Sequence, residues 1–135
     1  MSSQPPPSPS PQSGRDVVER YLDRIVAHDW AALSDCVAAD VVRVGPFGDT
    51  YSGKGDYLAF LSGLMPTLEG YSMRVDRIVA EARFAVAELT ETVEFDGTPI
   101  ETPEALVFDL DGDGRICHIA IYIQRHEGPP TRPPV

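Results

Sequence analysis

The stretch FAVAELTETVEFDGTPIETPEALVFDL, residues 84–110, decides the fold of this chain. Its side chains alternate with a period of two residues on both sides of a segment rich in turn formers, Asp96-Gly97-Thr98-Pro99. Such alternation is typical of strands that are buried on one face, and Gly and Pro favour a turn between them. The stretch therefore predicts an antiparallel hairpin with strands at 84–95 and 100–110.

One face of each predicted strand is apolar except for a glutamate, Glu91 in the first and Glu104 in the second. If the four-residue turn is correct, Phe95 pairs with Ile100 and Glu91 lies directly opposite Glu104. Two facing carboxylates in an apolar surface are destabilising unless one is protonated or both have a task. The two glutamates are therefore the first candidates for function. The rest of this face is Ala85, Ala87, Leu89, Val93 and Phe95, then Ile100, Thr102, Leu106, Phe108 and Leu110.

Three helices are predicted before the hairpin. The first starts near Asp16 with Ser13 as its N-cap, and the second is short and capped by Asp29. The third runs through Tyr57 to about Met65, where Pro66 stops it. The first helix has an apolar stripe at helical spacing, and the second carries four apolar residues. These residues are Val17, Val18, Tyr21, Leu22, Ile25 and Val26, then Trp30, Leu33, Cys36 and Val37.

Further strands are predicted at 41–44, 71–80 and 115–125. Helices followed by a meander give an α+β fold in which the helices cover one face of the sheet. With Asp111-Gly112-Asp113-Gly114 as the last turn, Leu110 pairs with Arg115. Ile119, Ile121 and Ile123 then share the face of Glu104, while His118, Tyr122 and Gln124 lie on the outer face. The run from Asp109 to Gly114 matches the start of a calcium loop, but position twelve is Ala120, so a turn is favoured.

Composition assigns one domain, residues 14–126, between two Pro-rich tails at 1–13 and 127–135. Nine of the 13 prolines lie in these tails, which lack the apolar residues needed to offset the entropy of ordering. The start has neither a basic segment nor an apolar run, and no stretch is long enough to span a membrane. The expectation is a cytoplasmic protein with disordered ends and no membrane partner.

Charge and cysteine content exclude several classes of function. The 135 residues carry a net charge of −10, and the 11 Lys and Arg residues are scattered, which argues against a nucleic-acid partner. The two cysteines, Cys36 and Cys117, are far apart and are expected to be free thiols in a reducing compartment. No metal-site spacing accompanies them, and neither a metal nor a cofactor is predicted.

In its motifs the chain resembles the nuclear transport factor 2-like superfamily, in its SnoaL-like and ketosteroid isomerase-like branch. The resemblance covers about residues 15–125 and rests on the order and spacing of several short motifs. These are Glu19-Arg20-Tyr21-Leu22-Asp23, His28-Asp29-Trp30, Gly45-Pro46-Phe47-Gly48, Asp56-Tyr57-Leu58-Ala59-Phe60 and Gly114-Arg115-Ile116. It implies a cone-shaped, cystatin-like fold, with three N-terminal helices packed on a curved antiparallel sheet around an apolar pocket. It also implies a homodimer.

The resemblance carries over only some catalytic residues. Ketosteroid isomerases use a tyrosine of the first helix as hydrogen-bond donor, and Tyr21 stands at that position. Their two aspartates correspond to Gly45 and Leu106, so that route is not expected. The residues of limonene-type epoxide hydrolases correspond approximately to Thr92, Glu94 and Ile121, so that mechanism is not expected either. Cyclase-like chemistry, which needs little more than an acid or base in a shaped cavity, stays open.

The resulting hypothesis is a small-molecule pocket protein, an isomerase, cyclase or hydrolase, with Glu91 and Glu104 as an acid/base pair. Tyr21 would donate a hydrogen bond to the developing oxyanion. The alternative is a module of the same fold that binds a ligand or dimerises without catalysis, with the glutamates solvated or paired with an arginine such as Arg43. A dimer would use the outer face of Val107, His118 and Tyr122. The predicted apolar pocket wall is Ile25, Phe47, Phe60, Leu61, Met65, Leu89, Val93, Phe95, Leu106, Ile119, Ile121 and Ile123.

Overall fold

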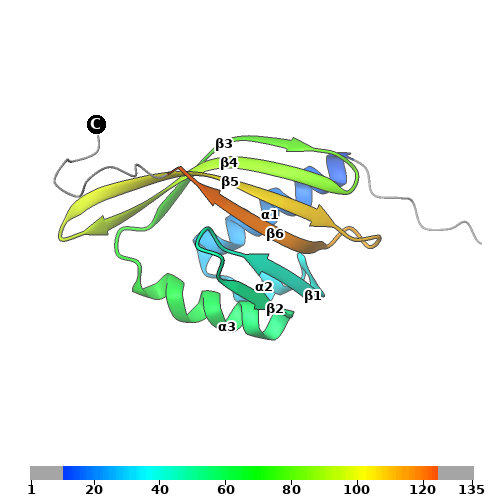
Figure 1. The fold of residues 1–135 in the computed structure, drawn as a ribbon, viewed down its shortest axis with the longest axis horizontal. Helices are drawn as coiled ribbons and strands as arrows, with labels where there is room; N and C mark the ends of the chain where they lie inside the picture. The colour runs from blue at the N-terminus through cyan, green and yellow to red at the C-terminus, as the bar shows by residue number, and fades with distance from the viewer. Residues whose placement is uncertain (1–10, 125–135) are drawn as a thin grey trace, which may run out of the picture.

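The computed structural model describes residues 11–124, which form a six-stranded sheet covered on one face by helices (Figure 1). The strand order is β2-β1-β6-β5-β4-β3. The helices are α1 (Pro11–Ala27), α2 (Trp30–Ser34), α3 (Lys54–Leu64) and the 3₁₀ turn η1 (Met65–Thr67). The strands are β1 (Val37–Val44), β2 (Thr50–Ser52), β3 (Ser72–Ala80), β4 (Phe84–Phe95), β5 (Thr98–Leu110) and β6 (Ile116–Ile123).

The sheet is mixed, which corrects the expectation of an antiparallel sheet. β3, β4, β5 and β6 form the predicted antiparallel meander, but β1 runs parallel to β6 and is extended by the short antiparallel strand β2. A parallel pair needs a long connection between its strands. Here β2, α3, η1 and strands β3 to β5 lie between β1 and β6 in the sequence. The α+β architecture with helices on one curved sheet is confirmed.

The structure has the three predicted α-helices, but their first and last residues differ from the predicted ones. Helix α1 begins at Pro11, not near Asp16, so Ser13 lies within the helix and residues 11–13 are not part of a tail. Proline is tolerated there because the first turn of a helix has unpaired N–H groups in any case. Asp29 caps α2 as predicted, accepting a hydrogen bond from the Ala32 N–H at 3.1 Å. The other tail residues, and residues 125–126 of the predicted domain, lie outside the described range.

Two boundaries near β1 were wrong. Helix α2 ends at Ser34, and β1 already starts at Val37, so Cys36 and Val37 are not helical. Both side chains are fully buried between the sheet and the helices, which explains why their apolar character resembled a helix stripe. Strand β2 was missed because three residues are too few to show alternation.

Both predicted turns exist, but each strand pairing is displaced. The β4–β5 turn has only two residues, Asp96-Gly97, so Phe95 pairs with Thr98 and Val93 with Ile100. At the other end, Leu110 pairs with Ile116, and a bulge shifts the remaining pairs of β5 and β6. The β4–β5 displacement is an even number of residues, so no side chain there changes face. Ile119 pairs with Phe108 and Ile121 with Leu106, on the predicted face.

The core lies between the helices and the concave face of the sheet. Val18 and Leu33 from the helices meet Phe108 and Ile119 from the sheet, all fully buried. Tyr21 packs edge-on against Phe108, with ring centroids 5.6 Å apart. The core therefore fills the middle of the molecule, and a space between the helices and the sheet remains near Leu68, in the α3–β3 connection.

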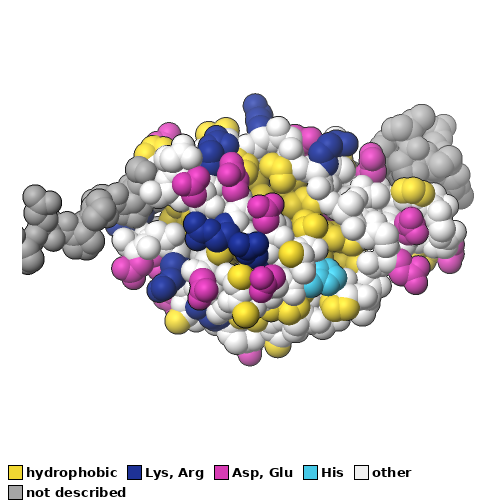
Figure 2. All heavy atoms as spheres, turned by 180° about the vertical axis from the view of Figure 1, so that it is seen from behind, with side chains coloured by type: hydrophobic (Ala, Val, Ile, Leu, Met, Phe, Trp, Pro, Cys, Tyr) yellow, Lys and Arg dark blue, Asp and Glu magenta, His cyan; other side chains and the backbone are white. Residues whose placement is uncertain are grey.

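The surface is charged and mixed in sign. On the face turned away from the view of Figure 1, Arg and Lys side chains lie next to Asp and Glu side chains, with apolar patches between them (Figure 2). On the convex face of the sheet, Arg77 and Glu88 form an ion pair, with Nε and Oε2 2.7 Å apart. Within residues 11–124, no helix is long and apolar enough to cross a membrane.

Candidate functional site

Two spaces on the concave side of the sheet meet at the predicted glutamates. The inner cavity, of about 130 Å³, lies between α1, α3, η1 and the concave face of the sheet. The outer space, of about 370 Å³, opens beside the turn that joins β1 and β2. Leu68, Glu91 and Glu104 line both spaces. The two glutamates therefore stand where a molecule entering from outside reaches the inner cavity.

Glu91 and Glu104 are diagonal neighbours on the concave face, not directly opposite each other. Glu91 pairs with Thr102 in the ladder and Glu104 with Leu89, and both side chains are half-buried. Desolvation by burial, a hydrogen bond with Glu91 and the negative charge of Glu91 together raise the pKa of Glu104 to about 9. At neutral pH Glu104 is therefore a carboxylic acid, and its O–H donates a hydrogen bond to a carboxyl oxygen of Glu91.

Tyr71 holds Glu91 from the other side. This residue precedes β3, and its hydroxyl donates a hydrogen bond to Glu91 Oε2. Met73, two residues further on, pairs with Glu91, so Tyr71 reaches Glu91 from the adjacent strand on the same face. Burial and the charge of Glu91 raise the pKa of Tyr71, so its hydroxyl remains a donor. Glu91 thus accepts hydrogen bonds from two neutral acids, Tyr71 and Glu104.

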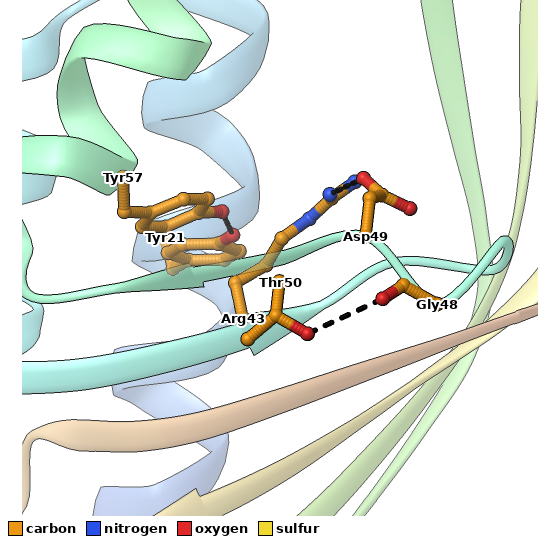
Figure 3. A network of polar contacts seen from close by, with 6 residues as sticks. All are labelled: Tyr21, Arg43, Gly48, Asp49, Thr50 and Tyr57. Carbon is orange, nitrogen blue, oxygen red and sulfur yellow. Dashed lines mark hydrogen bonds and ion pairs between the residues drawn. The ribbon is translucent and has the colours of Figure 1, made fainter.

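Two tyrosines form the second polar group of the inner cavity. Tyr21 of α1 and Tyr57 of α3 point toward each other, and their hydroxyls are hydrogen-bonded (Figure 3). Both are fully buried, and burial raises the pKa of Tyr57 to about 12 and that of Tyr21 well above its ordinary value. Both hydroxyls therefore stay protonated. Tyr57, Leu61 and Met65 recur every four residues, which turns all three inward from α3 and η1.

Arg43 is the cation of this cavity. It extends from β1, and its side chain is only 11% exposed. Its Nη1 donates to Asp49 Oδ2 at 2.6 Å (Figure 3), and its guanidinium lies 4.8 Å from the centroid of the Phe60 ring. Burial would raise the pKa of Asp49, but the hydrogen bond from Arg43 helps to lower it. Arg43 is paired with Asp49, not with either glutamate as the alternative prediction had suggested.

Asp49 also occupies the space in front of Gly45. A Cβ atom at position 45 would lie 2.2 Å from Asp49 Oδ1, much closer than any real contact. The β1–β2 turn brings the two residues together, with the Gly45 N–H donating to the Asp49 carbonyl at 2.7 Å. A side chain at position 45 would therefore force the Asp49 carboxylate out of its present position.

Most of the predicted pocket wall lines one of the two spaces. Ile25, Phe60, Leu61, Met65, Leu106 and Ile121 line the inner cavity, together with Tyr21. Phe47, Val93 and Ile123 line the outer space. Three predicted wall residues line neither space: Leu89 and Ile119 are buried in the core, and Phe95 is 68% exposed. Phe95 lies at the tip of the β4–β5 hairpin, which extends past the helices that would cover it (Figure 1).

The sequence prediction missed Tyr57, Tyr71 and Asp49, and it named Arg43 only in the alternative hypothesis, as a partner of one of the glutamates. The four-residue spacing of Tyr57 with Leu61 and Met65 could have indicated that Tyr57 faces inward. Arg43 stands out as a charged residue within the apolar strand Val41-Val42-Arg43-Val44, but the sequence does not indicate that its partner is Asp49. Tyr71 and Asp49 left no comparable signal, because their contacts depend on strand pairing and on a turn. Among residues 11–124, no group of three or more His, Cys, Asp or Glu side chains could hold a metal ion.

Comparison with solved structures shows the same fold at low sequence identity. A Kribbella flavida protein provisionally assigned as a ketosteroid isomerase aligns with a TM-score of 0.74 and 18% identity, covering 90% of this chain and 84% of that chain. A limonene epoxide hydrolase-like epoxide hydrolase of M. tuberculosis aligns with a TM-score of 0.73 and 20% identity, covering 84% of each. A Shewanella denitrificans protein provisionally assigned as a SnoaL-like polyketide cyclase aligns with a TM-score of 0.73 and 15% identity, covering 82% of this chain and 90% of that chain. At these identities the likeness concerns the fold alone.

Sequence comparison gives the family. No curated protein matches the chain significantly. The family model described as the SnoaL-like domain matches residues 18–119, a range that starts in α1 and ends in β6. That range includes both glutamates, the three tyrosines and Arg43. The chain belongs to the SnoaL-like domain family.

Proposed function

We propose that this protein is an enzyme that transfers a proton on a small, mostly apolar molecule. Glu91 acts as the base, Glu104 as the acid, and Tyr21 as the donor to a developing oxyanion. The observation that carries this proposal is the hydrogen-bonded pair of Glu91 and Glu104 at the junction of the two spaces. A carboxylate beside a neutral carboxylic acid supplies both partners of acid–base catalysis at one pH.

The reaction that suits this geometry is proton transfer next to a carbonyl group. Glu91 takes the proton from the carbon next to the carbonyl, and the electrons of the broken C–H bond form an enolate. The oxygen of the enolate carries the negative charge and accepts a hydrogen bond from Tyr21. Where the ketone is β,γ-unsaturated the enolate is a dienolate, and Glu104 then gives a proton to its γ-carbon, the C=C bond moves into conjugation with the carbonyl, and Glu104 regains a proton from Glu91. Epoxide opening, with Glu104 protonating the ring oxygen and Glu91 activating a water, uses the same two groups.

The relatives make this range of reactions reasonable. The three similar structures are named for a ketosteroid isomerase, an epoxide hydrolase and a polyketide cyclase. The chain lacks the aspartates expected for the first of these at Gly45 and Leu106. Glu91 and Glu104 supply carboxyl groups from other positions of the concave face.

A screen of small ketones, esters and epoxides tests the proposal. For any substrate found, Glu91→Gln and Glu104→Gln should each lower kcat by about 100-fold or more, the usual loss when an acid or base is removed. Glu88→Gln, on the outer face of β4 beside Arg77, is the matched control and should leave kcat unchanged. Unchanged turnover in Glu91→Gln would remove Glu91 from the mechanism.

A non-catalytic binding module is the second candidate function. It is favoured by Gly45 and by Leu106, an apolar side chain that lines the inner cavity where a ketosteroid isomerase would have an acid. This candidate predicts that ligands bind with micromolar or tighter affinity while no member of the screen is converted. If any bound ligand is converted and the conversion depends on Glu91, the binding-module candidate is wrong.

We also propose a homodimer that forms through the convex face of the sheet, in the cytoplasm. Tyr122 is 63% exposed there, near the half-buried Val107 and His118. Such an apolar surface favours a partner. Tyr122→Glu should convert a dimer to a monomer in size-exclusion chromatography with light scattering. A wild-type protein that is monomeric at all concentrations would contradict the proposal.

A further inference from the structure

A ligand that occupies both spaces would have one part in the inner cavity and another in the outer space. The inner cavity holds about 130 Å³, and the outer space about 370 Å³. Small-molecule sites usually measure about 300–1,000 Å³, so the inner cavity alone is too small for most ligands. A ligand that fills it must either be very compact or continue past Glu91 and Glu104 into the outer space.

The size of the inner cavity corresponds to a single ring. A cavity of about 150 Å³ in another protein binds one benzene molecule, so about 130 Å³ accepts a group of that size. Its walls are mostly apolar and come from α1, α3, η1 and the sheet. Fused ring systems are therefore too large to enter the inner cavity.

The charges around the cavity favour a neutral ligand. The guanidinium of Arg43 is already neutralised by the carboxylate of Asp49. Glu104 is protonated, so Glu91 supplies the remaining negative charge beside the entrance. An anionic group would have to lose its water and approach Glu91, and both steps cost free energy in a poorly solvated site.

The tyrosine pair can donate one further hydrogen bond. Each hydroxyl has one hydrogen, and one of the two is used in the bond between Tyr21 and Tyr57. The other hydrogen remains for an acceptor on the ligand. A ligand with one carbonyl oxygen on its ring would satisfy this donor, which would otherwise be buried without an acceptor.

We propose that the ligand has a neutral, single-ring head with one carbonyl oxygen, which occupies the inner cavity, and an apolar tail that extends through the outer space. This inference rests on the proposed function in one respect, namely that the part of the ligand next to the two glutamates is the part that reacts. The oxygen lies against the Tyr21–Tyr57 pair, the ring lies between α3 and Ile121, and the tail passes Val93 and Ile123. Phe47, on the β1–β2 turn, lines the outer end of this path.

Two isoleucines of β6 give a matched pair of variants. Ile121 lines the inner cavity and Ile123 the outer space, and both are half-buried on the same face of the strand. Ile121→Phe should fill the inner cavity, and Ile123→Phe should narrow only the outer space. Circular dichroism and thermal melts verify that both variants fold.

The test compares four ligands by NMR titration of the full chain. These are cyclohex-2-enone, a cyclohexenone with a hexyl chain opposite the carbonyl, 1-decalone and cyclohexanecarboxylate. We expect the two monocyclic ketones to bind, the hexyl ketone more tightly, while the fused and anionic compounds bind at least about tenfold more weakly. Ile121→Phe should weaken both monocyclic ketones about tenfold, and Ile123→Phe should weaken only the hexyl ketone.

Specific outcomes overturn the proposal. Equal binding of 1-decalone or of cyclohexanecarboxylate would refute the size or the charge argument. Binding of cyclohexenone that is insensitive to Ile121→Phe would refute its placement in the inner cavity. The titration is repeated with Glu91→Gln, in which the ketones should bind without being converted. If the wild type also binds the ketones without converting them, that result would contradict the proposed function and leave the ligand class intact.

Discussion

At the scale of single residues, we expect the hydroxyl of Tyr71 to influence which glutamate holds the shared proton. It donates to Glu91 and so stabilises Glu91 as the charged member of the pair. In Tyr71→Phe this preference is weakened, and the proton is shared more evenly between Glu91 and Glu104. At pH 7 the carboxyl ¹³C shifts of the two glutamates should move toward each other. Tyr122→Phe, on the exposed outer face, is the control; unchanged shifts in Tyr71→Phe would show that Tyr71 only packs.

The sequence allowed several residues of the site to be identified, but it did not allow their contacts to be predicted. Alternation alone placed Glu91 and Glu104 on the concave face, because a carboxylate within an apolar period-two pattern stands out. Helical spacing and the family resemblance placed Tyr21. The bond of Tyr71 to Glu91 and the position of Asp49 over Gly45 could not be predicted, because each joins side chains whose distance depends on strand register or turn geometry.

At the scale of elements, the β4–β5 hairpin is determined by Asp96-Gly97. Both residues have positive φ, 51° and 79°, as a tight two-residue turn requires. Gly97→Ala should therefore lower the free energy of unfolding by about 1 kcal/mol, measured by urea denaturation. Gly55→Ala in α3, where a Cβ meets nothing within 4 Å and φ is not positive, is the control and should be neutral or stabilising. Equal effects of the two changes would contradict this account of the turn.

The hairpin also shows why the strands were predicted well and their pairing was not. Pro99 favoured a four-residue turn, whereas the Asp-Gly pair already forms a complete one. Pro99 lies at the start of β5, where it pairs with Glu94. The resulting displacement changed the partners of Glu91 and Glu104 but not their face. The predicted faces of the two strands were therefore correct, and the predicted direct pairings were wrong. The parallel pairing of β1 with β6 was not predicted, since strand sequences that far apart do not indicate their neighbours.

At the scale of the whole molecule, the protonated glutamate links stability to pH. The pKa of Glu104 is about 9 in the folded protein, above its ordinary value near 4.5, so the folded state binds the proton more tightly than the unfolded state does. The stabilisation is complete below the ordinary pKa and is lost as pH rises through about 9. Urea denaturation should therefore show stability falling from pH 5 to pH 9. In Glu104→Gln, which cannot ionise, this decline should be smaller; an unchanged decline would assign it to other groups.

The central claim, that Glu91 and Glu104 share a proton at the entrance of the inner cavity, is tested most directly by a ¹³C NMR titration of the glutamate carboxyl groups. The account predicts that Glu104 titrates near pH 9 in the wild type, and that its pKa falls in Glu91→Gln because the neighbouring negative charge is lost. Titration of Glu104 near its ordinary value of 4.5 in the wild type would contradict the account, and the acid/base pair with it.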